Sequence, residues 1–191
     1  MSQKAFPNWF EMDAIRYFEK HLTHLKDQPN LLFLQLGAYT GDASIWLVQN
    51  ILTGKNCKLI DIDTWDSSNE AIYTTFNWND LKEVYEEKTS FTNIITAHQM
   101  TTTEFLKGCT DTFDFIYIDA DHTAQMVYDD AIRSWPMLKT DGIMAFDDYI
   151  WGEDLEPKLT PKPAIDKFLS EKSTELELLH QARQVWIKKT S

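Results

Sequence analysis

The sequence predicts an α/β fold in which a doubly wound, mostly parallel sheet carries helices on both faces and ends in an antiparallel hairpin. Three observations lead to this prediction. Short apolar runs alternate with segments of helical periodicity along most of the chain. Glycines or acidic residues follow several of those runs where they end. The last two apolar runs, at residues 176–180 and 184–188, lie close enough in sequence to pair as a hairpin.

The predicted elements follow one another from the N-terminus. An amphipathic helix is expected over residues 8–26, because large apolar side chains recur there at roughly helical spacing. The run LLFLQL at residues 31–36 has little polar alternation, as expected of a parallel strand buried on both faces. Further strands are expected at residues 57–63, 91–97, 113–119 and 142–146. Further helices are expected at residues 43–52, 80–87, 102–107, 124–138 and 161–170.

The composition is that of an ordinary globular protein, and we expect one domain over residues 1–191, with a helical cap at residues 1–30 and a core at residues 31–191. The formal net charge of −12 argues against a general basic surface for nucleic acid and against docking on anionic lipid. Cys57 and Cys109 lack metal-ligand spacing and are expected to be free thiols. No secretory signal or transmembrane run is evident, so a cytoplasmic location is expected.

Two acidic clusters follow two strands that the segment at residues 113–149 predicts to be parallel neighbours. The first cluster contains Asp119, Asp121 and His122, and the second contains Asp147 and Asp148. The carboxyl ends of parallel strands lie at one edge of the sheet, where open α/β sheets bind ligands. Carboxylates at this density favour a divalent cation, and the imidazole can accept a proton from a substrate hydroxyl. Asp121 could instead cap the helix that follows.

The turn GAYTG after the first strand, and the acidic end of the second, predict the other half of a binding site. Gly37 and Gly41 let the backbone approach a ligand closely at the start of a helix. Either Asp61 or Asp63 could accept hydrogen bonds from a ribose, and Asp63 is preferred because it ends the strand. Trp65 either covers an adenine edge or packs in the core.

These motifs, in this order, resemble those of class I S-adenosylmethionine-dependent methyltransferases. LQLGAYTG resembles their first motif and LIDIDTW their acidic second-strand motif. The segment FDFIYIDADHTAQMVYDDAIRSWPMLKTDGIMAFDDY, with the later QVWIKK strand, is similar to a subgroup of bacterial O-methyltransferases. That subgroup is similar to the macrocin and cephamycin-pathway enzymes and, more distantly, to catechol O-methyltransferase. The resemblance implies a Rossmann-like sheet of seven strands.

The resemblance also implies a role for individual positions. The residues implied to bind S-adenosylmethionine are Gln35, Gly37, Ala38, Tyr39, Gly41, Asp63, Thr64, Trp65, Met100, Thr101 and Asp119. Those implied to bind Mg²⁺ or another divalent cation are Asp119, Asp147 and Asp148. His122 falls where the catechol enzyme carries its base, so Asp119 and His122 are the implied catalytic residues. The expected reaction is methyl transfer to a hydroxyl of a small molecule.

One departure from the family and several alternatives remain open. The family usually has Glu or Asp two residues before its first glycine, where this chain has Gln35; Asp42 or another carboxylate could supply the missing charge. A metal-independent methyltransferase acting on nitrogen or a carboxylate is one alternative, and a degenerate module that binds cofactor without turnover is another. The G-x-x-x-G spacing disfavours a dinucleotide or nucleotide-sugar enzyme. Residues 69–78 are a candidate lid, and the oligomeric state stays open, a homodimer included.

Overall fold

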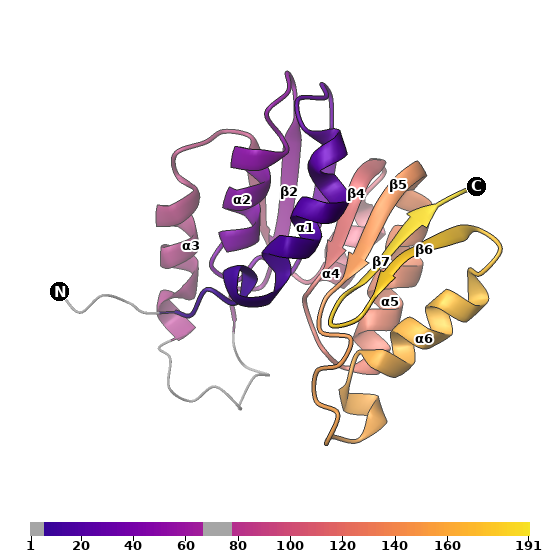
Figure 1. Ribbon diagram of the computed structural model, residues 1–191. Coiled ribbons are helices and arrows are strands. Elements are labelled where there is room, and N and C mark those ends of the chain that lie inside the picture. The colour runs from indigo at the N-terminus through magenta and orange to yellow at the C-terminus, as the bar shows by residue number, and fades with distance from the viewer. Residues whose placement is uncertain (1–5, 67–77) are drawn as a thin grey trace.

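The computed structural model describes residues 6–66 and 78–191, and its centre is one seven-stranded sheet (Figure 1). The strand order is β3-β2-β1-β4-β5-β7-β6. The strands are β1 Leu32–Leu36, β2 Lys58–Asp63, β3 Ile95–Gln99, β4 Phe113–Ile118, β5 Leu138–Phe146, β6 Leu176–Gln181 and β7 Val185–Lys189. Strands β1 to β5 are parallel, and β7 pairs antiparallel with both β5 and β6. The predicted fold class, with its C-terminal antiparallel hairpin, is confirmed.

Helices cover both faces of this sheet (Figure 1). The α-helices are α1 Ile15–Leu22, α2 Asp42–Asn50, α3 Leu81–Thr89, α4 Thr102–Gly108, α5 Ala124–Ser134 and α6 Lys162–Glu171. Alternate residues of each strand point to opposite faces, so the core is divided into two main clusters. Phe33, Phe115 and Trp186 pack with α1 and α2 on one face. Leu34 and Ile116 pack with α4, α5 and α6 on the other.

The N-terminal helix is less regular than expected. In place of one helix over residues 8–26, the chain forms a π-helical turn η1 (Phe10–Ala14), then α1, then a 3-10 turn η2 (Thr23–Leu25). The buried Phe18 fixes α1 against the sheet, where it contacts Tyr117 and Trp186 edge to face. The apolar spacing therefore identified a helical segment that packs against the core, but the prediction of one continuous helix was wrong.

Proline and edge-strand effects account for three other differences. The helix expected over residues 124–138 ends at Ser134, because Pro136 lacks an amide hydrogen, and the 3-10 turn η4 (Trp135–Met137) leads into β5. Strand β5 consequently starts at Leu138 rather than residue 142, with an irregular register against β4. Strand β3 starts at Ile95 rather than residue 91, because Phe91 is 54% exposed in the turn after α3.

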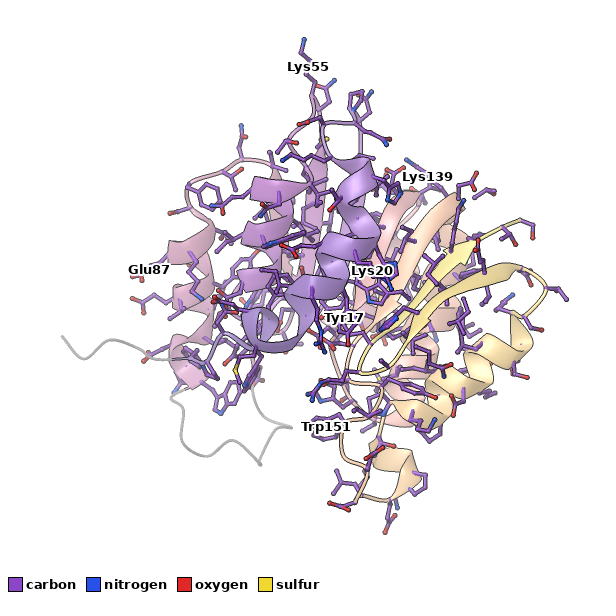
Figure 2. The ribbon with its side chains drawn as sticks, in the orientation of Figure 1. Tyr17, Lys20, Lys55, Glu87, Lys139 and Trp151 are labelled. Carbon is purple, nitrogen blue, oxygen red and sulfur yellow. The ribbon has the colours of Figure 1, made fainter. Side chains whose placement is uncertain are left out.

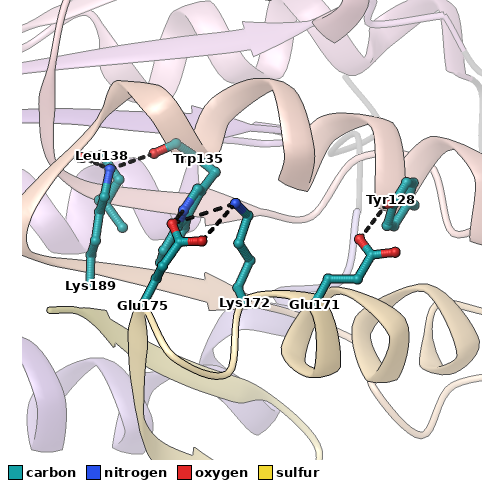
Figure 3. A network of polar contacts seen from close by, with 7 residues as sticks. All are labelled: Tyr128, Trp135, Leu138, Glu171, Lys172, Glu175 and Lys189. Carbon is teal, nitrogen blue, oxygen red and sulfur yellow. Dashed lines mark hydrogen bonds and ion pairs between the residues drawn. The ribbon is translucent and has the colours of Figure 1, made fainter. Parts of the chain in front are cut away.

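Polar contacts tie the last helix to α5 and the hairpin to the start of β5 (Figure 3). Tyr128 of α5 donates to Glu171 of α6 at 2.6 Å. Glu175 accepts hydrogen bonds from the indole of Trp135 at 3.1 Å and from Lys172 at 3.1 Å. Lys189 donates to the carbonyl oxygens of Trp135 and Leu138 at 3.1 and 2.9 Å. These bonds fix β7 at the centre of the antiparallel end of the sheet.

One sequence-based expectation falls almost entirely on residues that the structure does not describe. The candidate lid at residues 69–78 lies outside the described residues except for Trp78, which belongs to the 3-10 turn η3 (Trp78–Asp80). Within residues 6–66 and 78–191, none of the helices has both the length and the apolar character needed to span a membrane.

Candidate functional site

The candidate site lies along the carboxyl ends of the parallel strands, on the face covered by α1 and α2. Phe115 and Tyr117 of β4 belong to the core cluster on this face, and so do Ile143 and Ala145 of β5. Side chains alternate along a strand, so the residue two positions beyond each pair is directed to the same face at the edge. Asp119 and Asp147 are those residues, one on each strand. Strand pairing thus brings the two predicted acidic clusters together.

Gly37 joins the two halves of the site by a close backbone contact. Its φ is +89°, and a Cβ at this position would lie 1.9 Å from the carbonyl oxygen of Asp119. The Asp119 amide in turn donates to the carbonyl of Leu36 at 2.8 Å. Only glycine fits this contact without a backbone shift. The first turn and the end of β4 therefore touch directly, which places a ligand on the turn close to Asp119.

Asp63 holds the first turn in shape. Its Oδ2 accepts hydrogen bonds from the amides of Ala38 and Tyr39, both at 2.8 Å, and its Oδ1 accepts one from Trp65 at 2.7 Å. Burial raises the pKa of this carboxyl, although the three amides act in the opposite direction. The amides of Ala38 and Tyr39 are therefore bonded to Asp63 and are not free to bind a ligand.

Gln35 and Asp61 form a buried pair on adjacent strands, one layer below the edge. They are register partners of β1 and β2, and they are 2% and 0% exposed. The amide of Gln35 donates to the carbonyl of Gly37 at 2.9 Å, and its oxygen accepts from Ser44 at 3.3 Å. Tyr85 donates to Asp61 at 2.7 Å, and burial raises the pKa of Asp61 to about 6. Asp61 is therefore the register partner of Gln35, the position at which the family usually has Glu or Asp.

Asp42, the other residue considered for that charge, is engaged elsewhere. It accepts a hydrogen bond from the hydroxyl of Thr40 at 2.6 Å and forms an ion pair with Lys88 at 2.7 Å. Both contacts lie at the start of α2, where a carboxylate is favourable beside the helix N-terminus. Asp42 thus stabilises the junction of the first turn with α2 and α3.

The remaining predicted cofactor residues surround the ends of β2 and β3. Trp65 is 6% exposed and donates to the carbonyl of Tyr39 at 2.9 Å, so its indole packs in the core as one of the two expectations had it. The amide of Met100 donates to the carbonyl of Asp63 at 3.1 Å. Thr101 is the N-cap of α4, and it forms a reciprocal capping box with Glu104.

Thr64 completes this edge of the site. Its carbonyl accepts a hydrogen bond from the side chain of Gln99 at 3.0 Å, which bridges the ends of β2 and β3. Lys82 of α3 donates to the same Gln99 at 2.8 Å. Gln99 therefore ties the predicted cofactor residue Thr64 to the end of β3, which Met100 and Thr101 follow in sequence.

Three side chains come together in the acceptor half. One ligand atom each from Asp119, His122 and Asp148 lies within 4.8 Å of the others. His122 Nε2 lies 3.1 Å from Asp148 Oδ2, and the His122 ring contacts Trp151 with centroids 4.7 Å apart. Asp148 has a φ of +55°, and this left-handed turn immediately after Asp147 redirects the chain. This group can hold a cation or act as an oriented imidazole base.

Asp147 is placed differently from its neighbour. It accepts a short hydrogen bond from the hydroxyl of Tyr117 and binds the amide of Asp148 at 2.8 Å through Oδ1. Burial, followed by the charge of Asp148, raises the pKa of Asp147 to about 6. Gln184 donates to the Tyr117 hydroxyl at 3.4 Å. His122 therefore joins Asp119 and Asp148 in the candidate metal group, whereas the carboxylate of Asp147 is bonded to Tyr117, a core residue of β4.

Sequence reasoning missed three residues that shape this half. Tyr117 and Gln184 lie in segments predicted only as strands, and Trp151 lies outside every predicted element. The period of two along β4 could have identified Tyr117, because it precedes Asp119 by two positions on the same face. Nothing in the sequence marks Trp151 as a neighbour of His122, because the turn at Asp148 creates that contact. Asp121, in contrast, does not cap the helix that follows, because the N-cap residue is Thr123; its carboxylate accepts a hydrogen bond from the amide of Thr123 at 2.7 Å.

The family model described as a methyltransferase domain matches residues 34–149, which is more than half of the chain. The chain belongs to this methyltransferase family. The matched range begins in β1 and ends just after Asp148, so it contains the first turn and both acidic clusters. The predicted resemblance to class I S-adenosylmethionine-dependent methyltransferases is confirmed. No curated protein gives a significant match to the chain.

Solved structures of methyltransferases share this fold. The O-methyltransferase TomG from Streptomyces achromogenes, in complex with SAM, is 13% identical with a TM-score of 0.63, over 84% of this chain and 73% of TomG. An O-methyltransferase from Bacillus cereus, in complex with SAH, is 13% identical with a TM-score of 0.59, over 84% and 74%. The N-methyltransferase NodS from Bradyrhizobium japonicum WM9 is 14% identical with a TM-score of 0.58, over 96% and 98%. At these identities the likeness establishes the fold.

Proposed function

We propose that this methyltransferase transfers the methyl group of S-adenosylmethionine to a hydroxyl of a small molecule. The observation that carries the proposal is the pairing of His122 with Asp148 beside Asp119, at the strand end that touches the first turn. An imidazole held by a carboxylate is suited to remove a proton from a hydroxyl near neutral pH. The O-methyltransferases TomG and that of Bacillus cereus, described above with SAM and SAH, support the same cofactor and reaction.

The cofactor would lie over the first turn and the end of β2. The methionine part would lie beside Gly37, Ala38, Tyr39 and Gly41, because the contact of Gly37 with Asp119 brings this turn to the end of β4. Asp63 is the proposed ribose ligand in preference to Asp61, because Asp63 is only partly buried whereas Asp61 has no exposed surface. A carboxylate oxygen has two acceptor positions, so Asp63 can bind amides and a ribose hydroxyl together.

Gln35, Thr64, Trp65, Met100 and Thr101 would act mainly through these neighbours. Gln35 keeps the turn attached to α2 through its bonds to Gly37 and Ser44. Met100 and Thr101 would border the adenine at the end of β3. These assignments rest on proximity to the strand ends, and binding measurements on single variants would test each one.

The proposed chemistry is a single in-line displacement. His122 takes the proton from the acceptor hydroxyl, and the resulting oxygen attacks the methyl carbon. The new carbon–oxygen bond forms as the carbon–sulfur bond breaks, which leaves S-adenosylhomocysteine. Asp148 holds the imidazole in position and stabilises the imidazolium that forms. Most of the rate gain would come from holding the two reactants in line.

The residues of the acceptor half also fit a divalent cation. Two carboxylate oxygens and one imidazole nitrogen within 4.8 Å of one another can reach a common ion. Asp119 and Asp148 would hold it, with Asp147 available if its carboxylate leaves Tyr117. Such an ion would lower the pKa of a bound hydroxyl. Mg²⁺ prefers oxygen ligands, whereas a site that also includes His122 would favour Mn²⁺ or Zn²⁺.

Calorimetry with S-adenosylmethionine and S-adenosylhomocysteine is the first test. Saturable binding of either compound is expected. The proposal would be abandoned if neither bound at millimolar concentration. Radiolabelled methyl transfer to a panel of phenols, catechols and sugars, with and without EDTA, then identifies the acceptor class and the need for metal.

A second experiment tests the base. His122→Ala should lower turnover by about 10²- to 10⁴-fold while leaving the affinity for S-adenosylmethionine unchanged. His21→Ala would be a poor control, because His21 is buried in the core, so the exposed His24→Ala serves instead. A parallel loss of turnover and cofactor affinity in His122→Ala would show that the imidazole supports the fold of the edge instead.

A cofactor-binding module without turnover is the second candidate function. It is favoured by the amide of Gln35, which occupies the position of the family's acid and is committed to Gly37 and Ser44. Binding of S-adenosylmethionine without methyl transfer to any hydroxyl, amine or carboxylate in the panel would support this candidate. Transfer to amines or carboxylates alone would instead indicate the nitrogen- or carboxylate-directed enzyme.

A further inference from the structure

A tight turn after β5 supplies two side chains that contact the ring of His122. The amide of Trp151 donates to the carbonyl of Asp148 at 2.8 Å and closes a four-residue turn over residues 148–151. The first residue of this turn places its Oδ2 3.1 Å from His122 Nε2, and the last places its indole against the imidazole, with ring centroids 4.7 Å apart. Figure 2 shows Trp151 in the loop that leads from β5 to α6. We call residues 148–151 the imidazole turn.

The conformation of the imidazole turn has to be held by its surroundings. Asp148 has a φ of +55°, in the left-handed region that residues other than glycine rarely adopt. A residue keeps such a conformation where the structure around it over-determines the backbone. The side chain of Asp148 is 30% exposed, so close packing does not by itself fix the carboxylate. The next residue, Tyr149, is where the turn is attached to the rest of the fold.

Tyr149 is attached through its backbone and its ring. Its amide donates to the carbonyl of Arg183, between β6 and β7, at 2.9 Å. Its side chain is 7% exposed and belongs to the core cluster on the face covered by α5 and α6. Asp148 and Trp151 meet His122 on either side of this anchored residue. The turn is therefore fastened to the core at one point and contacts the imidazole from both of its ends.

The hydroxyl of Tyr149 ties the turn to two further elements. It donates to Asp166 Oδ1 at 2.7 Å, and it accepts from Gln181 of β6 at 2.7 Å and from Lys162 of α6. Lys162 and Asp166 also pair with each other at 3.1 Å along α6. Two of the three partners are ionised, and hydrogen bonds to ionised groups are the stronger kind. The position of the hydroxyl is thus fixed from α6 and from the hairpin together.

We propose that Tyr149 is a positioning residue for methyl transfer, because its bonds to α6 and to the hairpin hold the imidazole turn and the turn holds the ring of His122. This inference rests on the proposed function, in which His122 takes the proton from the acceptor. Tyr149 acts through Asp148 and Trp151 and does not itself touch a reacting atom. A misplacement of about 1 Å can cost about 100-fold in rate. Loosening the turn should therefore lower turnover without changing the binding of cofactor at the first turn.

Nuclear magnetic resonance of the full chain tests this positioning without cofactor or acceptor. In the wild type, the ring protons of His122 and Trp151 should give a nuclear Overhauser contact, because the two rings are adjacent. Tyr149→Phe keeps the buried ring, removes the three hydroxyl bonds and should lose the contact. Asp166→Ala leaves Tyr149 intact and should weaken the contact. Both variants should fold, because the side chains of Lys162 and Asp166 are each 46% exposed and water can replace the lost bonds.

Tyr128→Phe is the matched control. It removes a hydrogen bond of the same kind, from a tyrosine to the α6 carboxylate of Glu171, outside the imidazole turn. The contact between the two rings should persist in this variant. In steady-state kinetics with the acceptor that the panel identifies, Tyr149→Phe should lower kcat by about 10- to 100-fold and leave the KM for S-adenosylmethionine unchanged. Tyr128→Phe should match the wild type in both constants.

Three results would overturn the proposal: an unchanged ring contact in Tyr149→Phe, an equal loss of the contact in Tyr128→Phe, or a loss of cofactor affinity in step with kcat. A wild-type protein that transfers no methyl group would contradict the proposed function alone. The nuclear Overhauser contact would still decide whether Tyr149 holds the imidazole turn, since that measurement needs no turnover.

Discussion

Replacing Gly37 by alanine should destabilise the fold at the contact between the first turn and β4. The left-handed φ of +89° costs an alanine about 1–2 kcal/mol relative to its preferred conformation. Its Cβ would lie 1.9 Å from the carbonyl oxygen of Asp119 and 2.4 Å from the carbonyl carbon, and both are backbone atoms that cannot rotate away. Relief of such overpacking costs about 1–3 kcal/mol. The expected loss of unfolding free energy is therefore about 2–5 kcal/mol.

Urea unfolding followed by far-ultraviolet circular dichroism measures this loss for Gly37→Ala. Gly108→Ala is the matched control, because a Cβ added at Gly108 would meet no atoms within 4 Å, and this change should alter stability by about 1 kcal/mol or less. Affinity for S-adenosylmethionine should also fall in Gly37→Ala and not in Gly108→Ala. A Gly37→Ala protein within about 0.5 kcal/mol of the wild type would refute the reasoning, since neither the dihedral angle nor the contact would then constrain the turn.

Three further predictions concern polar groups around the two faces of the sheet. Burial raises the pKa of Asp130 to about 7, above the ordinary value near 3.8, so the wild type should lose stability as pH rises from about 4 to 7. In urea titrations at these pH values, Asp130→Asn should lose less stability than the wild type, whereas Asp129→Asn, at the neighbouring position, should lose as much as the wild type. Thr101→Ala removes the capping box of α4 and should lower the unfolding free energy by about 1 kcal/mol in the same assay, whereas an unchanged value would mean that the cap is not needed. Tyr117→Phe leaves buried Asp147 without its hydroxyl donor and should cost about 1–3 kcal/mol, which a thermal melt at constant pH would detect; no change in the melting temperature would contradict this role.

The order of strands and helices could be predicted because each buried strand is a short apolar run that ends in a turn residue. The run at β1 is buried on both faces, and Gly37 ends it where the backbone must approach β4. The same logic fails at the edge of the sheet. Only one side of β3 has a neighbouring strand and none of its residues is buried, so no apolar run marks it. Because Phe91 is apolar although exposed, the predicted strand began too early. Apolar content therefore locates central strands better than edge strands.

The candidate site could be predicted as a place but not as a set of contacts. Parallel topology alone brings Asp119 and Asp147 to one edge of the sheet. The bonds of Asp63 to Ala38 and Tyr39 join residues that are 25 and 24 positions apart, and no local pattern in the sequence records them. The buried position of Asp61 beside Gln35 likewise depends on strand register. These contacts had to come from the three-dimensional arrangement.

The two adjacent aspartates at the end of β5 show why register matters for function. In the sequence, Asp147 and Asp148 are equivalent carboxylates after the same strand. In the fold, Asp147 continues the alternation of the strand and is bound by Tyr117, whose hydroxyl also accepts from Gln184. Asp148 enters a left-handed turn and comes within 3.1 Å of His122. Asp147 is thus fixed by the core, whereas Asp148 is free of the strand and can orient the imidazole. A loss of turnover without a loss of stability is therefore expected for Asp148→Asn, and a loss of both for Asp147→Asn.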